Sequence, residues 1–197
     1  SYLLDISKSK ISQYMKNMLS VKIGPDQFFE IAHLTGLEAT GWTWAARLAD
    51  LDNDGLLDAY FTNGMVREFH NADLAARLSR ASTVRQRILN HENGPMLVER
   101  NLSFRNEGDF SFVPTSADWG LDLAGISFAA AFADFDLDGD LDLIINNLND
   151  APVLYRNRSE RGTRVTIGLS GRQSNRFGIG ARVTARADGL TQTRELS

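Results

Sequence analysis

The chain of 197 residues contains no cysteine, so it forms no disulfide and no thiolate metal site, although this absence leaves the cellular compartment open. Its 3 histidines, His33, His70 and His91, lie far apart and show no metal-ligand spacing such as H-E-x-x-H. The longest nearly apolar run, residues 124–133, is much shorter than the ~20 residues of a membrane-spanning helix, so we expect no membrane span. No basic segment followed by an apolar segment opens the sequence, so no secretion signal is visible.

The chain does contain enough apolar residues for a folded core. With 43% hydrophobic, 9% aromatic and 23% charged residues, it lacks the low hydrophobicity and high charge of a disordered protein, and its length fits one or two domains. Motifs of common enzymes are missing. There is no G-x-S-x-G nucleophile elbow and no P-loop, and Gly178-Ile179-Gly180 is too short for a dinucleotide-binding fingerprint. We therefore expect a protein that is not an enzyme.

Acidic residues concentrate in two short segments. The 25 acidic and 21 basic residues give a net charge of −4. Nine of the aspartates form two clusters: Asp50, Asp52, Asp54 and Asp58, then Asp134, Asp136, Asp138, Asp140 and Asp142. The other 16 acidic residues are outnumbered by the 21 basic ones, so the acidity belongs to these clusters and not to the whole surface. This balance, and the lack of aromatic residues among the basic ones, disfavours nucleic acid as a partner.

The two clusters belong to an internal repeat. Residues 17–64 align without a gap to residues 101–148, at an offset of 84 positions. The matched positions include glycines, asparagines and aromatic residues: Gly24 and Gly108, Phe28 and Phe112, Gly36 and Gly120, Gly41 and Gly125, Trp44 and Phe128, Asn63 and Asn147. Such a fixed offset is typical of proteins built from several copies of one structural unit.

Both repeats predict β-structure. Apolar runs at 43–49 and 127–133 end at the acidic clusters, and second runs follow at 59–62 and 143–145. Short apolar runs bounded by Gly, Asp and Asn fit buried strands better than helices. Further strands are expected at 110–112 and 153–155. The predicted fold class is therefore mainly β.

One long helix is expected near residues 71–91, with Asn71 as its N-cap and Gly94-Pro95 as its stop. Its apolar residues at helical spacing are Leu74, Leu78, Ala81, Val84 and Ile88. Its arginines form a basic face that we interpret as solvated surface: Arg77, Arg80, Arg85 and Arg87. A shorter helix near the N-terminus is expected from the spacing of Ile11, Tyr14, Met15 and Met18.

The composition changes near residue 160, which predicts two domains, 1–160 with the repeats and 161–197 as a small β domain. Residues 164–169 and 181–187 alternate apolar and polar residues, and Asp188-Gly189 predicts a hairpin turn before the strand 191–196. This pattern stops unfinished. We therefore expect the small β domain to be truncated and the chain to be part of a longer protein.

Both acidic segments have the pattern D-x-D-x-D-G-x-x-D. Carboxylates at positions 1, 3 and 5 converge when the chain curls, glycine at position 6 allows the sharp turn, position 7 offers its carbonyl and position 9 completes the set. The candidate metal ligands are Asp50, Asp52, Asp54, the Leu56 carbonyl and Asp58, then Asp134, Asp136, Asp138, the Asp140 carbonyl and Asp142. Ligands that are all oxygen suit a hard cation, with Ca²⁺ ahead of Mg²⁺, and predict two sites.

Two alternatives to this interpretation are weaker. An EF-hand needs a bidentate Glu at position 12, where this sequence has Phe61 and Ile145. Polar turns would explain one Asp-Gly pair, but not two full nine-residue patterns at one offset. Whether the bound cation only stabilises the fold or also serves function is left open, with the structural role favoured.

The repeats resemble FG-GAP/VCBS repeats, which form β-propeller blades. The resemblance lies in Gly41-Trp-Thr-Trp-Ala-Ala-Arg-Leu-Ala-Asp-Leu-Asp-Asn-Asp-Gly55 and in Ser127-Phe-Ala-Ala-Ala-Phe-Ala-Asp-Phe-Asp-Leu-Asp-Gly-Asp-Leu-Asp142. The segment Gly171-Arg-Gln-Ser-Asn-Arg-Phe-Gly-Ile-Gly-Ala-Arg-Val183 resembles the start of an ASPIC/UnbV domain. The combination is similar to the cartilage acidic protein family and its bacterial relatives. It implies calcium-binding blades, here a partial propeller of about two and a half blades with an inserted helix, and an exported or cell-surface location.

These features together predict a non-enzymatic, calcium-binding module of β-propeller type. We expect it to serve adhesion or the recognition of a protein or glycan, at the cell surface, in the periplasm or after secretion. The alternative is a part of an extracytoplasmic glycan-processing enzyme, and a nucleic-acid-binding protein is a weaker third. The sequence specifies neither the ligand nor the oligomeric state.

Overall fold

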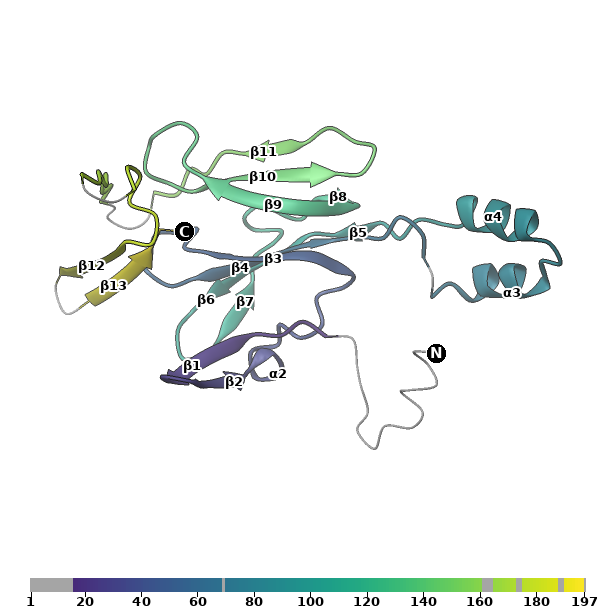
Figure 1. The fold of residues 1–197 in the computed structure, drawn as a ribbon, viewed down its shortest axis with the longest axis horizontal. Coiled ribbons are helices and arrows are strands. Elements are labelled where there is room, and N and C mark those ends of the chain that lie inside the picture. The colour runs from purple at the N-terminus through teal and green to yellow at the C-terminus, as the bar shows by residue number, and fades with distance from the viewer. Residues whose placement is uncertain (1–15, 69, 161–164, 173–174, 188–189, 197) are drawn as a thin grey trace.

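The structure is a computed structural model, and it describes residues 16–68, 70–160, 165–172, 175–187 and 190–196. The chain is mainly β, which confirms the predicted fold class at that level (Figure 1). Two larger sheets, three two-stranded sheets and three helices make up the described residues, and none of these sheets closes on itself. No described helix has the length and apolar character that crossing a membrane requires.

Each of the two larger sheets contains one matched pair of strands, β3 and β4 from the first repeat or β9 and β10 from the second, and the first sheet also takes β6 and β7 from the start of the second repeat. The first has the strand order β3-β4-β6-β7 and the second the order β11-β10-β9, and both are antiparallel. Their bounds are β3 Thr43–Ala49, β4 Asp58–Asn63, β6 Leu102–Asn106, β7 Phe112–Pro114, β9 Ser127–Ala133, β10 Asp142–Asn147 and β11 Val153–Tyr155. Strands β3 and β9 are separated by 84 residues at both ends, and so are β4 and β10. The sequence repeat is therefore a structural repeat.

The two sheets share one hydrophobic core. Every residue of β4 is buried, and Tyr60 in that strand and Ile145 in β10 are 0% exposed. They belong to one cluster of buried residues drawn from both repeats: Ala49, Leu51, Tyr60, Leu121, Ala130, Leu143 and Ile145. Each large aliphatic side chain in such a core contributes roughly 1.5–3 kcal/mol of burial free energy. Because β3 and β9 lie side by side, the two acidic segments emerge next to each other (Figure 1).

A buried polar chain also joins the repeats, at the strand ends away from the acidic segments. The Thr43 hydroxyl donates to Asn63 Oδ1 at 2.8 Å, and its counterpart Ser127 donates to Asn147 Oδ1 at 2.8 Å. Between them, Asn101 Oδ1 accepts from the Asn63 backbone nitrogen at 2.9 Å, and Asn101 Nδ2 donates to Ser127 Oγ at 2.9 Å. Buried polar groups cost free energy unless they are paired, so this chain fixes the relative placement of the two repeats.

The prediction of one helix over 71–91 is wrong, because the segment forms two helices, α3 Ala72–Arg80 and α4 Val84–Glu92. They lie side by side and project away from the sheets (Figure 1). The break has a local cause. Thr83 Oγ1 accepts from the Gln86 backbone nitrogen at 3.2 Å, and Gln86 Oε1 accepts from the Ser82 backbone nitrogen at 3.1 Å. This pair resembles a capping box and starts a new helix.

The residues of α3 and α4 differ in their burial. Asn71 is the N-cap of α3 as predicted, since its Oδ1 accepts from the Leu74 nitrogen at 3.0 Å, and Leu74 is buried. By contrast, Val84 and Ile88 belong to α4 and are 73% and 52% exposed, so they do not share one helix with Leu74 as their spacing predicts. Helix α4 ends at Glu92, ahead of the predicted stop at Gly94-Pro95.

Several shorter elements differ from the prediction. Phe110 has a φ of 63° in a turn, so the predicted strand 110–112 begins only at Phe112. Residues 165–169 form no strand. Met18 does not lie in a helix. The rest of the predicted N-terminal helix, Ile11 to Met15, lies outside the described residues. Elements that no pattern predicted are β1 Ser20–Gly24, β2 Gln27–Glu30, α2 Ala32–Thr35, β5 Glu99–Arg100, β6 Leu102–Asn106 and β8 Ala124–Gly125.

The C-terminal segment contains the expected antiparallel pair, β12 Arg182–Ala187 and β13 Leu190–Glu195. Its predicted turn, Asp188-Gly189, lies outside the described residues, as does the segment 161–164 beside the predicted domain boundary. The boundary itself stays a prediction.

Candidate metal centre

Each acidic segment is the loop of a β-hairpin. The first joins β3 to β4, and the second joins β9 to β10. The two loops have the same backbone: Asn53 and Leu137 at position 4 have φ values of 58° and 61°, and Gly55 and Gly139 at position 6 have 93° and 91°. A left-handed backbone costs a side-chain-bearing residue roughly 1–2 kcal/mol, so both loops hold a strained, closed turn.

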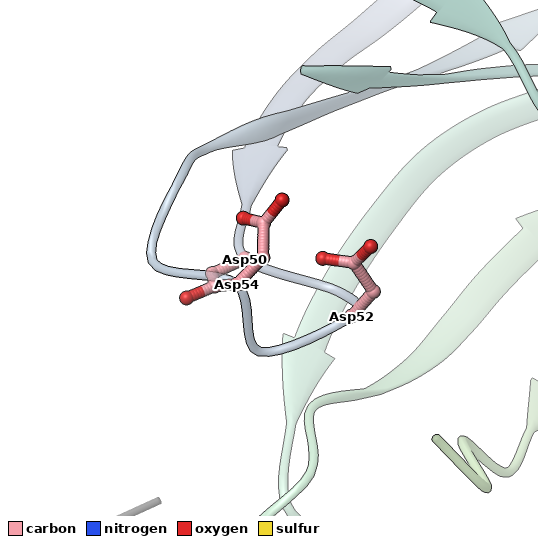
Figure 2. Close-up of side chains that lie close together, drawn as sticks. All are labelled: Asp50, Asp52 and Asp54. Atoms are coloured by element: carbon pink, nitrogen blue, oxygen red, sulfur yellow. The ribbon is translucent and has the colours of Figure 1, made fainter. Parts of the chain in front are cut away.

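The loops bring together the three predicted carboxylates at positions 1, 3 and 5. In the first loop, Asp50, Asp52 and Asp54 each place a carboxylate oxygen within 4.8 Å of the others (Figure 2). The corresponding group in the second loop is Asp134, Asp136 and Asp138. Either group could hold a metal ion, as the sequence pattern predicts.

Backbone amides hold these carboxylates in place. Asp50 Oδ2 accepts from the Gly55 nitrogen at 3.0 Å, and Asp54 Oδ1 accepts from the Leu56 nitrogen at 2.8 Å. The matching bonds of the second loop run from Gly139 to Asp134 at 3.0 Å and from Asp140 to Asp138 at 3.0 Å. Each loop is therefore already curled around its carboxylates.

The aspartates at position 9 have a different environment. Asp58 is 0% exposed and lies at the start of β4, where Oδ2 accepts from the Leu51 nitrogen at 2.8 Å and Oδ1 from the Asn106 nitrogen at 2.9 Å. In the second loop Asp142 accepts from the Phe135 nitrogen at 3.0 Å and the Asn157 nitrogen at 2.8 Å. These aspartates brace the base of each loop. Each oxygen keeps a second lone pair, so it can still bind a cation. The role of these aspartates as ligands stays a prediction.

Burial and crowding disfavour the charged forms of the first loop. Burial raises the pKa of the Asp58 carboxyl to about 6, despite its two backbone hydrogen bonds, which lower it. Burial also raises the pKa of Asp50, and the charges of Asp54 and Asp52 add to that effect. A cation among these groups would offset both the repulsion and the desolvation.

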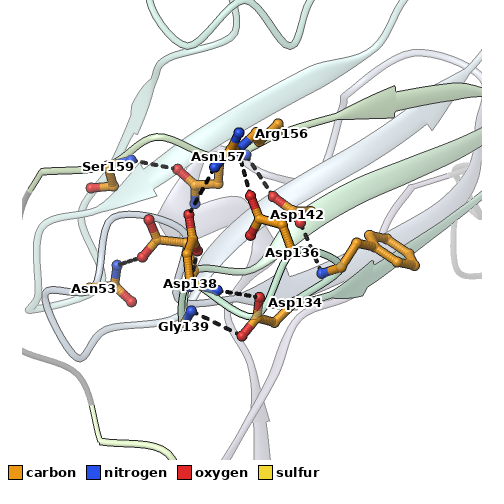
Figure 3. Close-up of polar contacts among 11 residues, drawn as sticks. Asn53, Asp134, Asp136, Asp138, Gly139, Asp142, Arg156, Asn157 and Ser159 are labelled. Atoms are coloured by element: carbon orange, nitrogen blue, oxygen red, sulfur yellow. Dashed lines mark hydrogen bonds and ion pairs between the residues drawn. The ribbon is translucent and has the colours of Figure 1, made fainter.

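The predicted carbonyl ligands at position 7 belong to dissimilar residues. The Leu56 side chain is partly exposed, whereas Asp140 is 1% exposed. Asp140 Oδ1 accepts a hydrogen bond from Asn53 Nδ2 of the first loop at 2.7 Å, so the two loops are in contact (Figure 3). The role of both carbonyls as ligands stays a prediction.

Sequence reasoning missed one pair of residues, Asn106 and Asn157. Asn106 Nδ2 donates to the Leu57 carbonyl at 3.1 Å, and Asn157 Nδ2 donates to the Leu141 carbonyl at 3.2 Å, so each asparagine supports its own loop. Each follows an arginine in an Arg-Asn pair, at the end of β6 or directly after β11, at an offset of 51 instead of 84. The helical insertion lengthens the segment between the first loop and Asn106, and this hides the match. A repeat search that allowed one gap would have found it.

The arginines of these pairs distinguish the two loops. Arg156 Nε lies 2.5 Å from Asp136 Oδ2 and its Nη2 lies 3.8 Å from Asp138 Oδ2, so a guanidinium contacts the second group (Figure 3). Arg105 pairs instead with Glu107. The first group has a more distant cation, Arg194 Nη2, at 3.8 Å from Asp50 Oδ2.

The residues of both loops fit Ca²⁺. Every convergent group is a carboxylate oxygen, which hard cations prefer, and neither loop offers nitrogen or sulfur ligands from His or Cys. In the first loop, Asp50 Oδ1 is buried, and no hydrogen-bond donor among the described residues reaches it. A carboxylate oxygen in that state is an expected ligand for a cation.

Comparison of the chain with protein-family models and with curated proteins finds no match. The functional argument therefore rests on the geometry of the two loops. The resemblance to FG-GAP/VCBS and ASPIC/UnbV sequences stays a prediction.

Proposed function

We propose that this chain is a calcium-stabilised recognition module that is not an enzyme. The observation that carries the proposal is the recurrence of one closed loop, with three convergent carboxylates and the same backbone hydrogen bonds, in both repeats. A polar turn needs only one or two such residues. Two complete copies of the arrangement are what a repeated Ca²⁺ site requires.

In this proposal each Ca²⁺ has five protein ligands. They are Asp50, Asp52, Asp54, the Leu56 carbonyl and Asp58 in the first loop, and Asp134, Asp136, Asp138, the Asp140 carbonyl and Asp142 in the second. The bound ion neutralises carboxylates that otherwise repel one another and holds each pair of strands closed at its loop end. Carboxylates that ligate Ca²⁺ are poor proton carriers, which supports a role other than catalysis.

We further propose that the repeats are β-propeller blades of the FG-GAP/VCBS type, followed by an ASPIC/UnbV-like domain, in an extracytoplasmic protein. The antiparallel sheets that share one core at a fixed offset support this. Helices α3 and α4 offer an exposed surface for a protein or glycan, with basic residues Arg77, Arg80, Arg85 and Arg87 and the exposed Val84 and Ile88.

Thermal unfolding with and without CaCl₂ tests the calcium claim. Saturating Ca²⁺ should raise the midpoint of the wild-type chain by about 5–10 °C, because a ligand that binds only the folded state stabilises it. Asp52→Asn and Asp136→Asn should each lose part of that rise, and the double variant nearly all of it. MgCl₂ should give a smaller rise. If the wild-type chain has the same unfolding midpoint in EGTA and in CaCl₂, the proposal is refuted.

A further inference from the structure

We infer that the two loops bind their cations cooperatively, through hydrogen bonds that Asn53 and Asn157 make between the loops. The inference rests on the proposed calcium-binding function and adds a coupling between the two sites. The hydrogen bonds lie where the two acidic loops contact each other.

The first contact joins position 4 of one loop to position 7 of the other. Asn53 Nδ2 donates to Asp140 Oδ1 at 2.7 Å, and Asp140 is 1% exposed, so the acceptor of this bond is buried. The equivalent positions are apolar: Leu137 corresponds to Asn53 and is 87% exposed, and Leu56 corresponds to Asp140. The polar pair is thus specific to this junction and is not a property of every copy of the loop.

The second contact passes through Asn157. Its Nδ2 donates both to the Leu51 carbonyl of the first loop at 2.7 Å and to the Leu141 carbonyl of the second at 3.2 Å. Its backbone nitrogen donates to Asp142 Oδ1 at 2.8 Å (Figure 3). The equivalent Asn106 donates to the Leu57 carbonyl and to Asp58 Oδ1 and accepts from the Gly108 nitrogen, and none of these partners lies in the second loop. Asn157 therefore bridges two loops where Asn106 supports one.

These contacts exist only when both loops are curled. A cation that orders the first loop fixes the Leu51 carbonyl and the Asn53 amide in the positions that the second loop contacts. The second cation then meets a loop that has already lost part of its conformational freedom, so it binds more tightly. By linkage, a cation in the second loop has the same effect on the first.

Electrostatics contributes negative coupling between the two sites, because a cation bound in one loop reduces the negative charge that attracts a cation to the other. Salt screens this long-range term, whereas it leaves short hydrogen bonds largely intact. At 0.15 M salt we expect the contacts to dominate and the coupling to be positive, with a factor of about 5 or more.

Calorimetric Ca²⁺ titrations measure this coupling. Asp52→Asn reports the second loop alone, and Asp136→Asn reports the first loop alone. The product of the two stepwise association constants of the wild type should exceed the product of these single-site constants by about fivefold or more.

Asn53→Leu copies the residue of the second loop. It should reduce the excess to less than about twofold while changing each single-site constant little. Leu137→Ala is the matched control at the exposed equivalent position and should keep the excess. Asn157→Ala should lose the coupling, whereas Asn106→Ala should weaken the first loop and keep the coupling. Amide hydrogen exchange in EGTA checks that each variant is folded.

The outcomes separate the two claims. If the wild type binds two ions whose constants multiply to the single-site product, or if Asn53→Leu keeps the full excess, the coupling is refuted while the calcium sites stand. If the wild type binds no Ca²⁺, the proposed function fails and the coupling fails with it.

Discussion

At the scale of single residues, aspartates of one motif have two kinds of surroundings. Those at positions 1, 3 and 5 converge on a common point, and those at position 9 are buried and accept backbone amides. The motif predicts that, within each repeat, all of these aspartates lie in one loop. It contains no information on Asn106, whose amide reaches Asp58 from a strand 48 residues away. Side chains that arrive from another strand depend on sheet pairing, which a local pattern does not specify.

The raised pKa of Asp58 predicts a pH dependence of stability in the calcium-free protein. Its folded-state pKa of about 6 lies above the ordinary value of 3.8, so between these values the folded state binds more protons than the unfolded state. The contribution of Asp58 to the free energy of unfolding is therefore fully present below about pH 3.8 and is lost as pH rises through 6. We expect a loss of up to about 3 kcal/mol.

Urea unfolding in EGTA at several pH values between 4 and 7 measures this loss. Asp58→Asn cannot titrate, so it should flatten that part of the profile, even though it lowers stability at every pH by removing a buried acceptor. Wild type and Asp58→Asn with parallel pH profiles would contradict the assignment. Calcium affinity should change in the opposite direction and rise with pH, because protons compete with the cation.

At the scale of elements, the hairpins of the repeats were predictable, and the helical insertion was only partly so. Strands β3, β9 and β11 have the bounds that their apolar runs predict, because turn residues bound each run, although only Ala49 of β3 and no residue of β11 is buried. Helix α4 has no buried residue, so no core selects its register. Its start depends on the local cap at Thr83, which outweighs the helical spacing that continues across residues 81–83.

The insertion should be dispensable for calcium binding. Its base is closed by the Met65–Leu97 β-bridge and by the hydrogen bond from the Glu68 nitrogen to the Pro95 carbonyl at 2.8 Å. In the second repeat, a short turn joins β10 to β11 without any helix. Replacing residues 69–94 with a short Gly-Ser linker should leave the calorimetric Ca²⁺ affinity within about twofold, since loop closure depends weakly on length. A tenfold loss of affinity would show that the helices support the loops.

At the scale of the whole molecule, the 84-residue repeat accounts for the arrangement of strands and loops, which composition alone does not predict. One offset places two hairpins, two loops and a shared core, and the buried chain through Asn101 fixes the repeats to each other at the opposite end. The contact of Asn53 with Asp140 could not be predicted, because it depends on how the two sheets pack. The acidity of the chain is thus a local property of two loops, and two bound Ca²⁺ ions would cancel its net charge of −4.

Counting the bound ions tests the central claim most directly. Equilibrium dialysis against ⁴⁵Ca²⁺, with native mass spectrometry of the same samples, should give two ions per wild-type chain. Asp52→Asn and Asp136→Asn should each bind one ion, and the double variant none. A wild-type chain that binds no Ca²⁺, or a double variant that still binds two ions, would contradict the assignment of these loops as calcium sites.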